Sequence, residues 1–303
     1  PTHITAPTLS KMAELTVGYL GMGIMGSAMA RNLLKSGAFK DVYVWNRSAD
    51  KCSELVAEGA KTAGSAAEVV QACDITFACL SDPAAALACV ESTGGVLDGI
   101  SSGKAYVDVS TVDEACSKRI CELVTGKGGV FLEAPVSGSK KPAIDGQLIF
   151  LCGGDEALYN RCLPAFEIMG KKSFFFGATG LGARMKLVVN MIMGSMMSAF
   201  SEGMSLADKS GLKQEQLLEV LSLGAMNNPL FNMKGPGVIA HNYPPAFPLK
   251  HQQKDMRLAL ALGDDVDQPL PVAAAANEAY KAAKAAGLGD NDMSAVHEAI
   301  RRQ

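Results

Sequence analysis

The sequence predicts an α/β fold: an N-terminal doubly wound, mostly parallel sheet domain followed by an all-helical C-terminal domain. From Leu15 to about Phe176, short β-branched runs alternate with amphipathic segments, which is typical of repeated strand–helix units with right-handed crossovers. After Gly177 the strand-like runs stop, and long helical patterns rich in Met and small residues follow. The expected domains are therefore residues 15–178 and 179–303. Residues 1–14 are interpreted as a leader or a cloning remnant.

The expected strands are β-branched or aromatic runs bounded by turn residues, at 16–20, 41–45, 74–80, 105–110, 130–136 and 148–151. The apolar repeat from Met25 to Leu33 predicts a helix that ends at Gly37. Ser65 and Glu68 have the spacing of a capping box and predict another helix start. In the second domain, helical patterns cover about 183–210, 214–221, 249–262 and 272–285.

Composition excludes several classes of protein. The chain is 48% hydrophobic with a net charge of −3, so it can bury a core and lacks the basic surface of a nucleic-acid binder. Polar residues interrupt every apolar stretch, including residues 187–200, so no membrane span is expected. None of the eight cysteines forms a CxxC pair, which favours buried thiols over a disulfide framework or a metal site.

A glycine-rich motif follows the first expected strand and opens the first helix. Gly21, Gly23 and Gly26 match the GxGxxG pattern, with Ile24 and Met25 between them. In this context the first glycine permits a tight turn, the second lets the backbone approach a pyrophosphate, and the third allows close helix–strand packing. The motif predicts a dinucleotide-binding Rossmann domain.

The residues after the second expected strand predict that the dinucleotide is NADP. An NAD site usually has a carboxylate there to bind the ribose hydroxyls, whereas this chain has Asn46, Arg47 and Ser48. No acid is present to repel a 2′-phosphate, and the guanidinium of Arg47 offers donors that suit one.

Two further stretches contain candidate catalytic groups. Glu133–Lys140 ends an expected strand with small residues and a proline, so its backbone N–H groups and hydroxyls could hold a carboxylate. Lys186 and Asn190 are four residues apart among apolar neighbours and share one helix face. Burial can lower the pKa of a lysine toward a range useful for acid–base catalysis.

The runs 134–142, 185–197 and 247–258, together with the glycine motif, resemble the β-hydroxyacid dehydrogenase family. The resemblance extends from about Thr16 to the C-terminus and is strongest with its plant-type glyoxylate/succinic semialdehyde reductases. It implies NADPH-dependent reduction of a small aldehyde-acid, glyoxylate to glycolate and succinic semialdehyde to 4-hydroxybutyrate. It also implies a homo-oligomer, a dimer or a tetramer, while charge and composition predict no nucleic-acid or membrane partner.

The resemblance implies roles at matching positions. Lys186 would protonate the aldehyde oxygen and Asn190 would orient the substrate or the lysine. The substrate would be bound by Ser137, Gly138, Phe247 and Asp255, and the cofactor by the glycine motif, Asn46 to Ser48, Thr111 and Lys254. No metal is expected.

Other interpretations remain open from the sequence. One is a 3-hydroxyisobutyrate-type dehydrogenase that works oxidatively with NAD. The Asn46–Arg47 pair argues against NAD as the cofactor. Another is a non-catalytic dehydrogenase-like module, as in relatives that lost the lysine and act within larger nuclear proteins. The expected compartment is the cytoplasm, with the chloroplast as the alternative.

Overall fold

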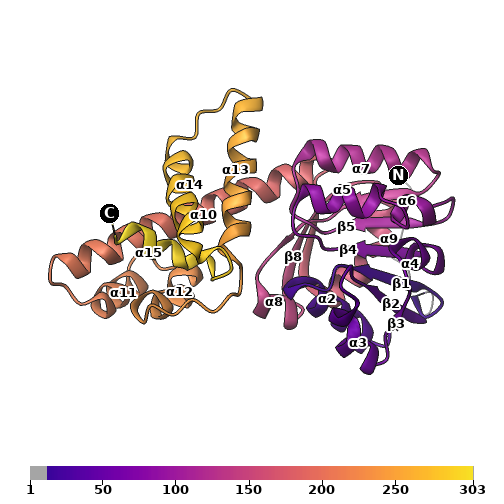
Figure 1. The fold of residues 1–303 in the computed structure, drawn as a ribbon, viewed down its shortest axis with the longest axis horizontal. Coiled ribbons are helices and arrows are strands. Elements are labelled where there is room, and N and C mark those ends of the chain that lie inside the picture. The colour runs from indigo at the N-terminus through magenta and orange to yellow at the C-terminus, as the bar shows by residue number, and fades with distance from the viewer. Residues whose placement is uncertain (1–11, 303) are drawn as a thin grey trace. The chain divides into compact units, whose positions relative to one another are not determined.

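A computed structural model describes residues 12–302 of the chain (Figure 1). The backbone divides into two compact units between Lys186 and Leu187, and each unit is described by itself. The domain boundary expected at residue 178 stays a prediction. Residues 1–11 of the expected leader lie outside the described residues, whereas Met12 is buried.

The first unit is built on a twisted sheet whose strand order is β3-β2-β1-β4-β5-β6-β8-β7, with β9 paired to β8. Neighbouring strands from β3 to β6 are parallel, and β8 runs antiparallel to β6. The chain leaves β1 toward β2 on one side and later returns to β4 on the other, so the winding direction switches between β1 and β4. Ligands bind at such a switch point in open α/β sheets. The strands are β1 (Thr16–Leu20), β2 (Asp41–Trp45), β3 (Lys61–Thr62), β4 (Ile75–Ala78), β5 (Ala105–Asp108), β6 (Val130–Glu133), β7 (Val136–Ser137), β8 (Leu148–Gly154) and β9 (Gly170–Phe175).

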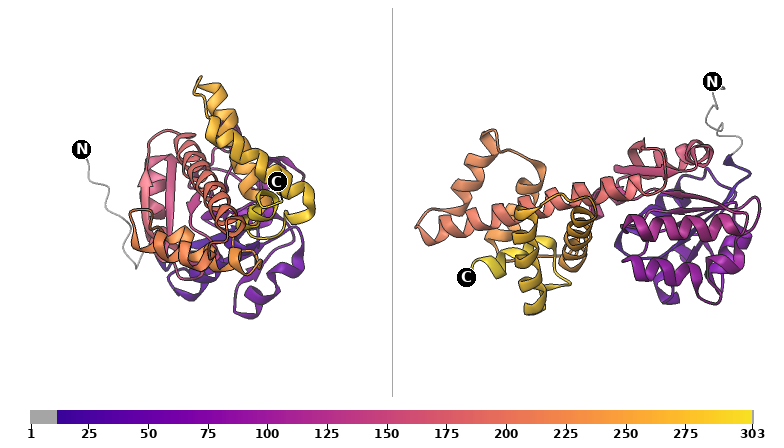
Figure 2. Two further views of the ribbon diagram at one scale, coloured as in Figure 1. Left: turned by 90° about the vertical axis from the view of Figure 1, so that its left-hand side faces the viewer. Right: turned by 90° about the horizontal axis from the view of Figure 1, so that it is seen from above.

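Helices cover both faces of this sheet, because alternate strand residues enter two separate cores (Figure 2). In β5, Ala105 and Val107 pack into the core under α2 (Ile24–Lys35) and α9 (Glu156–Met169), whereas Tyr106 faces the opposite core. The helices that contribute to the second core are α4 (Ala66–Ala72), α5 (Pro83–Glu91), α6 (Val96–Gly99) and α7 (Glu114–Gly126). The short helices α3 (Ser53–Ala57) and α8 (Lys140–Ile144) complete the unit.

The second unit is helical. Its core includes Phe200 stacked on Phe231, with ring centroids 4.6 Å apart, and the buried Met256 and Tyr280. The 29-residue helix α10 (Leu181–Lys209) begins in the first unit and continues into the second. The helices that follow are α11 (Gln214–Leu223), α12 (Pro229–Ile239), α13 (Leu249–Asp265), α14 (Pro271–Ala283) and α15 (Val296–Ile300).

The predicted fold class is confirmed, and β1 and β2 have the predicted bounds. The cap at Ser65 is also present, since its hydroxyl accepts a hydrogen bond from the Glu68 N–H at 3.2 Å. The Glu68 carboxylate, however, accepts from Gly64 N–H at 2.8 Å and not from the cap residue itself.

Some elements differ from the prediction. The strand expected over 130–136 is split into β6 and β7, because Pro135 cannot donate a ladder hydrogen bond. Strand β9 and helix α12 were not predicted. Helix α12 contains Gly235, Pro236 and Gly237, which oppose helix formation in isolation.

Several cysteines are buried thiols, as expected. Burial raises the pKa of Cys73, Cys89 and Cys162 to about 12 and that of Cys152 higher still. Across residues 12–302, no group of His, Cys, Asp and Glu side chains is arranged to hold a metal ion. In the same residues, no helix combines the length and apolarity needed to cross a bilayer.

Candidate active site

The glycine motif forms a turn that only glycine can make at two of its positions. Gly21 has φ +94°, and a Cβ there would lie 2.3 Å from the Cys79 carbonyl oxygen. A Cβ on Gly26 would lie 1.9 Å from the carbonyl oxygen of Gly21. Both contacts are impossible for a side-chain carbon, so these glycines are required for β1, the turn and α2 to pack this closely.

The middle glycine of the motif faces open space. A Cβ on Gly23 would meet no protein atom within 4 Å, and Gly23 is the N-cap of α2 without a side-chain capping hydrogen bond. The N-terminal N–H groups of a helix favour an anion, and the first turn of α2 carries no acid. The exposed Ile24 and the half-buried Met25 follow at the start of the helix. These features fit the pyrophosphate of a dinucleotide.

The residues after β2 line a pocket of about 210 Å³, whose walls include Asn46, Arg47 and Gly64. The Asn46 side chain accepts a hydrogen bond from Met22 N–H at 3.0 Å and donates one to the Ser48 carbonyl at 3.0 Å. Asn46 therefore connects the glycine motif to the pocket. Arg47 and Ser48 are exposed, so their side chains can reach a ligand phosphate without desolvation of the protein interior.

The predicted catalytic pair lies on α10. Lys186 is 5% exposed and Asn190 is 2% exposed, one helical turn apart. The Asn190 side-chain amide donates to the Asp255 carboxylate at 2.6 Å, and Asp255 on α13 is 1% exposed. The Lys254 ammonium lies 3.1 Å from the other oxygen of Asp255. The structure thus brings together three of the predicted residues in one buried polar cluster.

Close packing of α10 on α13 supports this cluster. The side-chain amide of Gln252 donates to the Asn190 carbonyl at 2.9 Å. A Cβ on Gly194 would lie 2.4 Å from that same amide nitrogen and 2.5 Å from the Met256 sulfur. The sequence prediction missed Gln252, although it lies within the run 247–258 that carried the resemblance.

The predicted substrate residues of the sheet lie in and after β7. Ser137 is half-buried and pairs with Ile149 in β8, and Gly138 follows with φ +136°. A Cβ on Gly138 would lie 2.6 Å from a Leu148 methyl group, so this turn requires glycine. The half-buried Thr111 follows the carboxyl end of β5, on the edge of the sheet where Gly21 follows β1.

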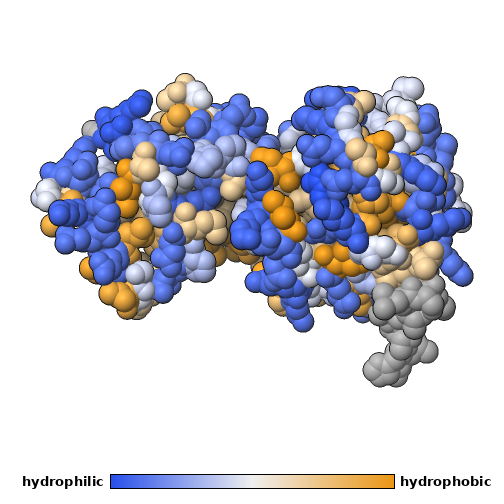
Figure 3. Space-filling model, turned by 90° about the horizontal axis from the view of Figure 1, so that it is seen from below, coloured by the Kyte–Doolittle hydropathy of each residue, from blue (hydrophilic) through white to orange (hydrophobic). Residues whose placement is uncertain are grey.

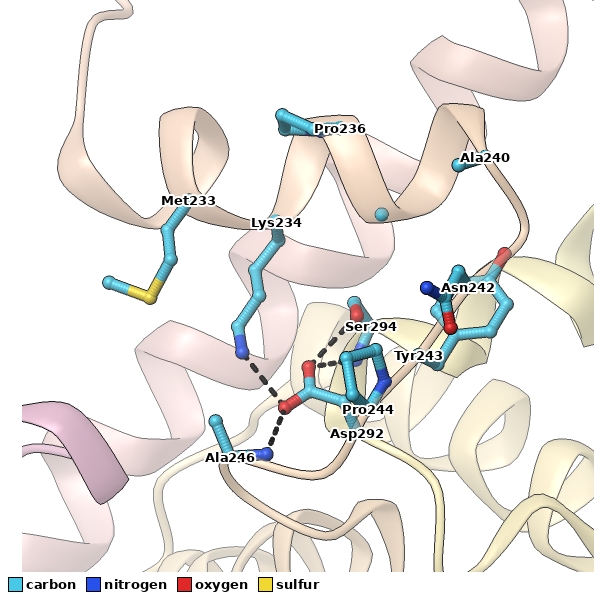
Figure 4. Close-up of a pocket in the computed structure, with 11 residues that line it drawn as sticks. Met233, Lys234, Pro236, Ala240, Asn242, Tyr243, Pro244, Ala246, Asp292 and Ser294 are labelled. Atoms are coloured by element: carbon cyan, nitrogen blue, oxygen red, sulfur yellow. Dashed lines mark hydrogen bonds and ion pairs between the residues drawn. The ribbon is translucent and has the colours of Figure 1, made fainter.

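Phe247 precedes α13 in a segment that the carboxylate of Asp292 holds in place. Asp292 accepts hydrogen bonds from the N–H groups of Ala246 and Phe247, both at 3.1 Å. It also pairs with the Lys234 ammonium at 2.8 Å, and Figure 4 shows its contacts with Lys234 and Ala246. Burial alone would raise the pKa of Asp292, but Lys234 and the backbone donors hold it below its ordinary value. Asp292, Lys234 and Ala246 line a pocket of about 430 Å³ within the helical unit.

The two units match two family models. Residues 16–177 match the NAD binding domain of 6-phosphogluconate dehydrogenase, and residues 180–300 match the NAD-binding domain of NADP-dependent 3-hydroxyisobutyrate dehydrogenase. Glyoxylate/succinic semialdehyde reductase 1 of Arabidopsis thaliana is 62% identical over 95% of this chain and 99% of its own length. The chain belongs to the β-hydroxyacid dehydrogenase family, among the glyoxylate/succinic semialdehyde reductases. It is an oxidoreductase, as the sequence predicted.

Further relatives show how this dehydrogenase fold is used elsewhere. Chloroplastic glyoxylate/succinic semialdehyde reductase 2 of Arabidopsis thaliana is 56% identical over 98% of this chain and 82% of its own length. The human cytokine-like nuclear factor N-PAC is 49% identical over 93% of this chain, which spans 51% of that protein. A solved 3-hydroxyisobutyrate dehydrogenase from Salmonella typhimurium is 28% identical with a TM-score of 0.86, over 94% of this chain and 99% of that chain.

Proposed function

We propose that this dehydrogenase reduces glyoxylate to glycolate and succinic semialdehyde to 4-hydroxybutyrate with NADPH. The observation that carries the proposal is the 62% identity to an Arabidopsis reductase of that name over 99% of the reductase's length. Both substrates combine an aldehyde with a carboxylate and differ in the distance between the two. The two aldehydes differ by two methylenes, each of which changes discrimination by only about 1–3 kcal/mol, so activity on both is expected, with different kcat/KM.

NADPH supplies the hydride that adds to the aldehyde carbon. The Lys186 ammonium donates a proton to the aldehyde oxygen, so no alkoxide accumulates. Asn190, held by Asp255, orients the reacting oxygen by hydrogen bonding, while Ser137 and the backbone of Gly138 bind the substrate carboxylate. Phe247 supplies an apolar wall.

The cofactor preference for NADPH rests on the pocket after β2. Arg47 binds the 2′-phosphate through charge-assisted hydrogen bonds, and Asn46 and Ser48 shape the adjoining ribose site. The glycine motif, from Gly21 through Ile24 and Met25 to Gly26, binds the pyrophosphate. Thr111 and Lys254 are proposed to contact the cofactor as well.

The test is the loss of NADPH absorbance with each aldehyde, for the wild type and for Lys186→Ala. Loss of general-acid catalysis lowers kcat by about 10²- to 10⁴-fold. Lys209→Ala removes an exposed lysine from the other end of α10 and serves as the matched control, with unchanged kcat. A wild type that binds NADPH and reduces neither aldehyde would refute the substrate assignment, and an active Lys186→Ala would refute the role of the lysine.

A second candidate is oxidation of 3-hydroxyisobutyrate. It is favoured by the match of residues 180–300 to the 3-hydroxyisobutyrate dehydrogenase model and by the fold shared with the Salmonella enzyme. The two functions are distinguished by assaying 3-hydroxyisobutyrate with NAD⁺ and with NADP⁺. Turnover there at a kcat/KM above that for both aldehydes would replace the first proposal.

We also propose that the protein self-associates through its helical unit. Large apolar side chains of that unit are exposed, among them Leu206, Val220, Leu223 and Met226. Figure 3 shows apolar residues among hydrophilic ones on one face of the molecule. Exposed apolar area of this kind is typical of a subunit contact. Light scattering of the purified protein tests the dimer or tetramer, and a monomer at micromolar concentration would refute it.

The expected compartment is the cytoplasm, and the chloroplast is the alternative because one relative is named as chloroplastic. A fluorescent fusion of the complete coding sequence distinguishes the two.

A further inference from the structure

The start of α10 is capped by one carboxylate from a distant strand. Oε1 of Glu133 accepts hydrogen bonds from the N–H groups of Gly180 at 2.7 Å, Gly182 at 2.8 Å and Ala183 at 3.3 Å. The regular helical ladder then begins, with Arg184 N–H donating to the Gly180 carbonyl at 2.9 Å. The first N–H groups of a helix have no partner within the helix, so here a side chain 47 residues away satisfies three of them.

Neighbouring residues hold the Glu133 side chain in one position. It is the last residue of β6 and is 2% exposed. Its second oxygen accepts a hydrogen bond from the hydroxyl of Ser117 on α7. A Cβ on Gly153 would lie 2.7 Å from Oε1, and a Cβ on Gly182 would lie 3.1 Å from it. Only glycine at these two positions leaves room for the carboxylate to reach the helix.

Burial of this carboxylate has an energetic cost that its hydrogen bonds offset only in part, so its pKa stays above the ordinary value. Burial raises the pKa of Glu133, while Ser117 and the three backbone N–H groups act in the opposite direction. Asp108 is its register partner on β5, so the two acidic residues end neighbouring strands. A buried acid placed at a helix N-terminus also interacts favourably with the helix dipole.

We propose that Glu133 is a positioning residue that fixes the catalytic lysine by anchoring the start of α10 to the sheet. Lys186 lies one helical turn after Gly182, which is bonded to Glu133, so a shift of the first turn moves the lysine with it. The inference rests on the proposed function of Lys186. Displacement of a reacting group by about 1 Å can cost about 100-fold in rate.

Three substitutions test the proposal. Glu133→Ala removes the acceptor, Glu133→Asp retracts it by about one bond length, and Glu133→Gln keeps an oxygen at the same place. We expect kcat to fall about 100-fold for alanine and about 10-fold for aspartate, and to stay within about 5-fold for glutamine. The dissociation constant for NADPH should stay within about 3-fold in each, because the glycine motif is untouched. Glu114→Ala is the matched control, since Glu114 pairs with the Arg184 side chain at the same helix start and not with its backbone.

The isotope effect with C4-deuterated NADPH separates positioning from loss of folded enzyme. Misplacement of Lys186 slows the chemical step, so the effect on kcat increases in Glu133→Ala and Glu133→Asp. A smaller fraction of folded enzyme leaves it unchanged. Aspartate and alanine variants with wild-type kcat, or a lower kcat with an unchanged isotope effect, would overturn the proposal.

Amide hydrogen exchange over residues 178–190 provides a readout that needs no substrate. Exchange there should accelerate about 10-fold or more in Glu133→Ala and Glu133→Asp and stay at the wild-type rate in Glu133→Gln. Unchanged exchange in both shortened variants refutes the anchoring, whatever the activity. A wild type that reduces neither aldehyde, with accelerated exchange in the variants, instead refutes the proposed function and retains the anchor.

Discussion

The buried contact between Asn190 and Asp255 makes a quantitative prediction about stability. The donor and the carboxylate oxygen are 2.6 Å apart, and both residues are almost completely buried. A hydrogen bond to a buried charged group contributes about 1.5–3 kcal/mol, so Asn190→Ala should lower the free energy of unfolding by about 2 kcal/mol. Asp255→Ala should cost about 3–5 kcal/mol, because it also removes the carboxylate that pairs with the buried ammonium of Lys254.

Thermal unfolding measures both changes. With about 3 °C for each kcal/mol in a domain of this size, Tm should fall by about 6 °C for Asn190→Ala and about 12 °C for Asp255→Ala. The double variant should lose less than the sum of the two, because the residues share one interaction. Asn232→Ala is the control, since Asn232 is an exposed asparagine in α12 and its loss should shift Tm by less than about 2 °C. Additive losses, or an Asn190→Ala variant as stable as the control, would contradict the reasoning.

Four further substitutions test the cofactor site and the dependence of stability on pH. Arg47→Ala should raise KM for NADPH about 10- to 100-fold and leave KM for NADH unchanged, and equal losses for both cofactors would argue against a phosphate contact. Gly23→Ala should fold with the wild-type Tm yet bind NADPH at least about 10-fold more weakly in a fluorescence titration. Gly26→Ala should instead lower Tm by several degrees, since its Cβ would overlap a carbonyl oxygen. Burial alone would raise the pKa of Glu298, but its hydrogen-bond donors lower this pKa to about 2. The ionised Glu298 therefore adds stability above about pH 4.5, and this stability is lost as the pH falls from 4.5 to 2. In Glu298→Gln, Tm should therefore fall less between pH 4.5 and pH 2 than it does in the wild type. An unchanged fall of Tm in this variant would show that other groups cause the acid sensitivity.

Local signals made part of the fold predictable. Strand β2 alternates buried and half-buried residues between clear turn signals, and its bounds were predicted correctly. Strand β9 was missed because it is an edge strand with Lys171 and Lys172 exposed, which lowers its apolar signal. Helix α12 was missed because of its internal glycines and proline, although Asn228 as N-cap and Pro229 at the first position are a recognisable start signal.

In the candidate site, too, only the features that depend on local sequence could be predicted. The spacing of Lys186 and Asn190 on one helix face could be read from the sequence, because it depends only on the period of a helix. The capping of α10 by Glu133 could not, since its contacts join residues far apart in the chain and appear only once β6 and α10 are placed together. The hydrogen bond from Gln252 to the Asn190 carbonyl is long-range in the same way.

The raised thiol pKa values have a consequence for an enzyme that handles aldehydes. Thiolates add to aldehydes to give hemithioacetals, and the protonated thiol is far less nucleophilic. With a pKa of about 12, Cys73, Cys89 and Cys162 are thiolate in only roughly one molecule in 10⁵ at pH 7. At neutral pH these three side chains therefore add to a reactive carbonyl compound only slowly.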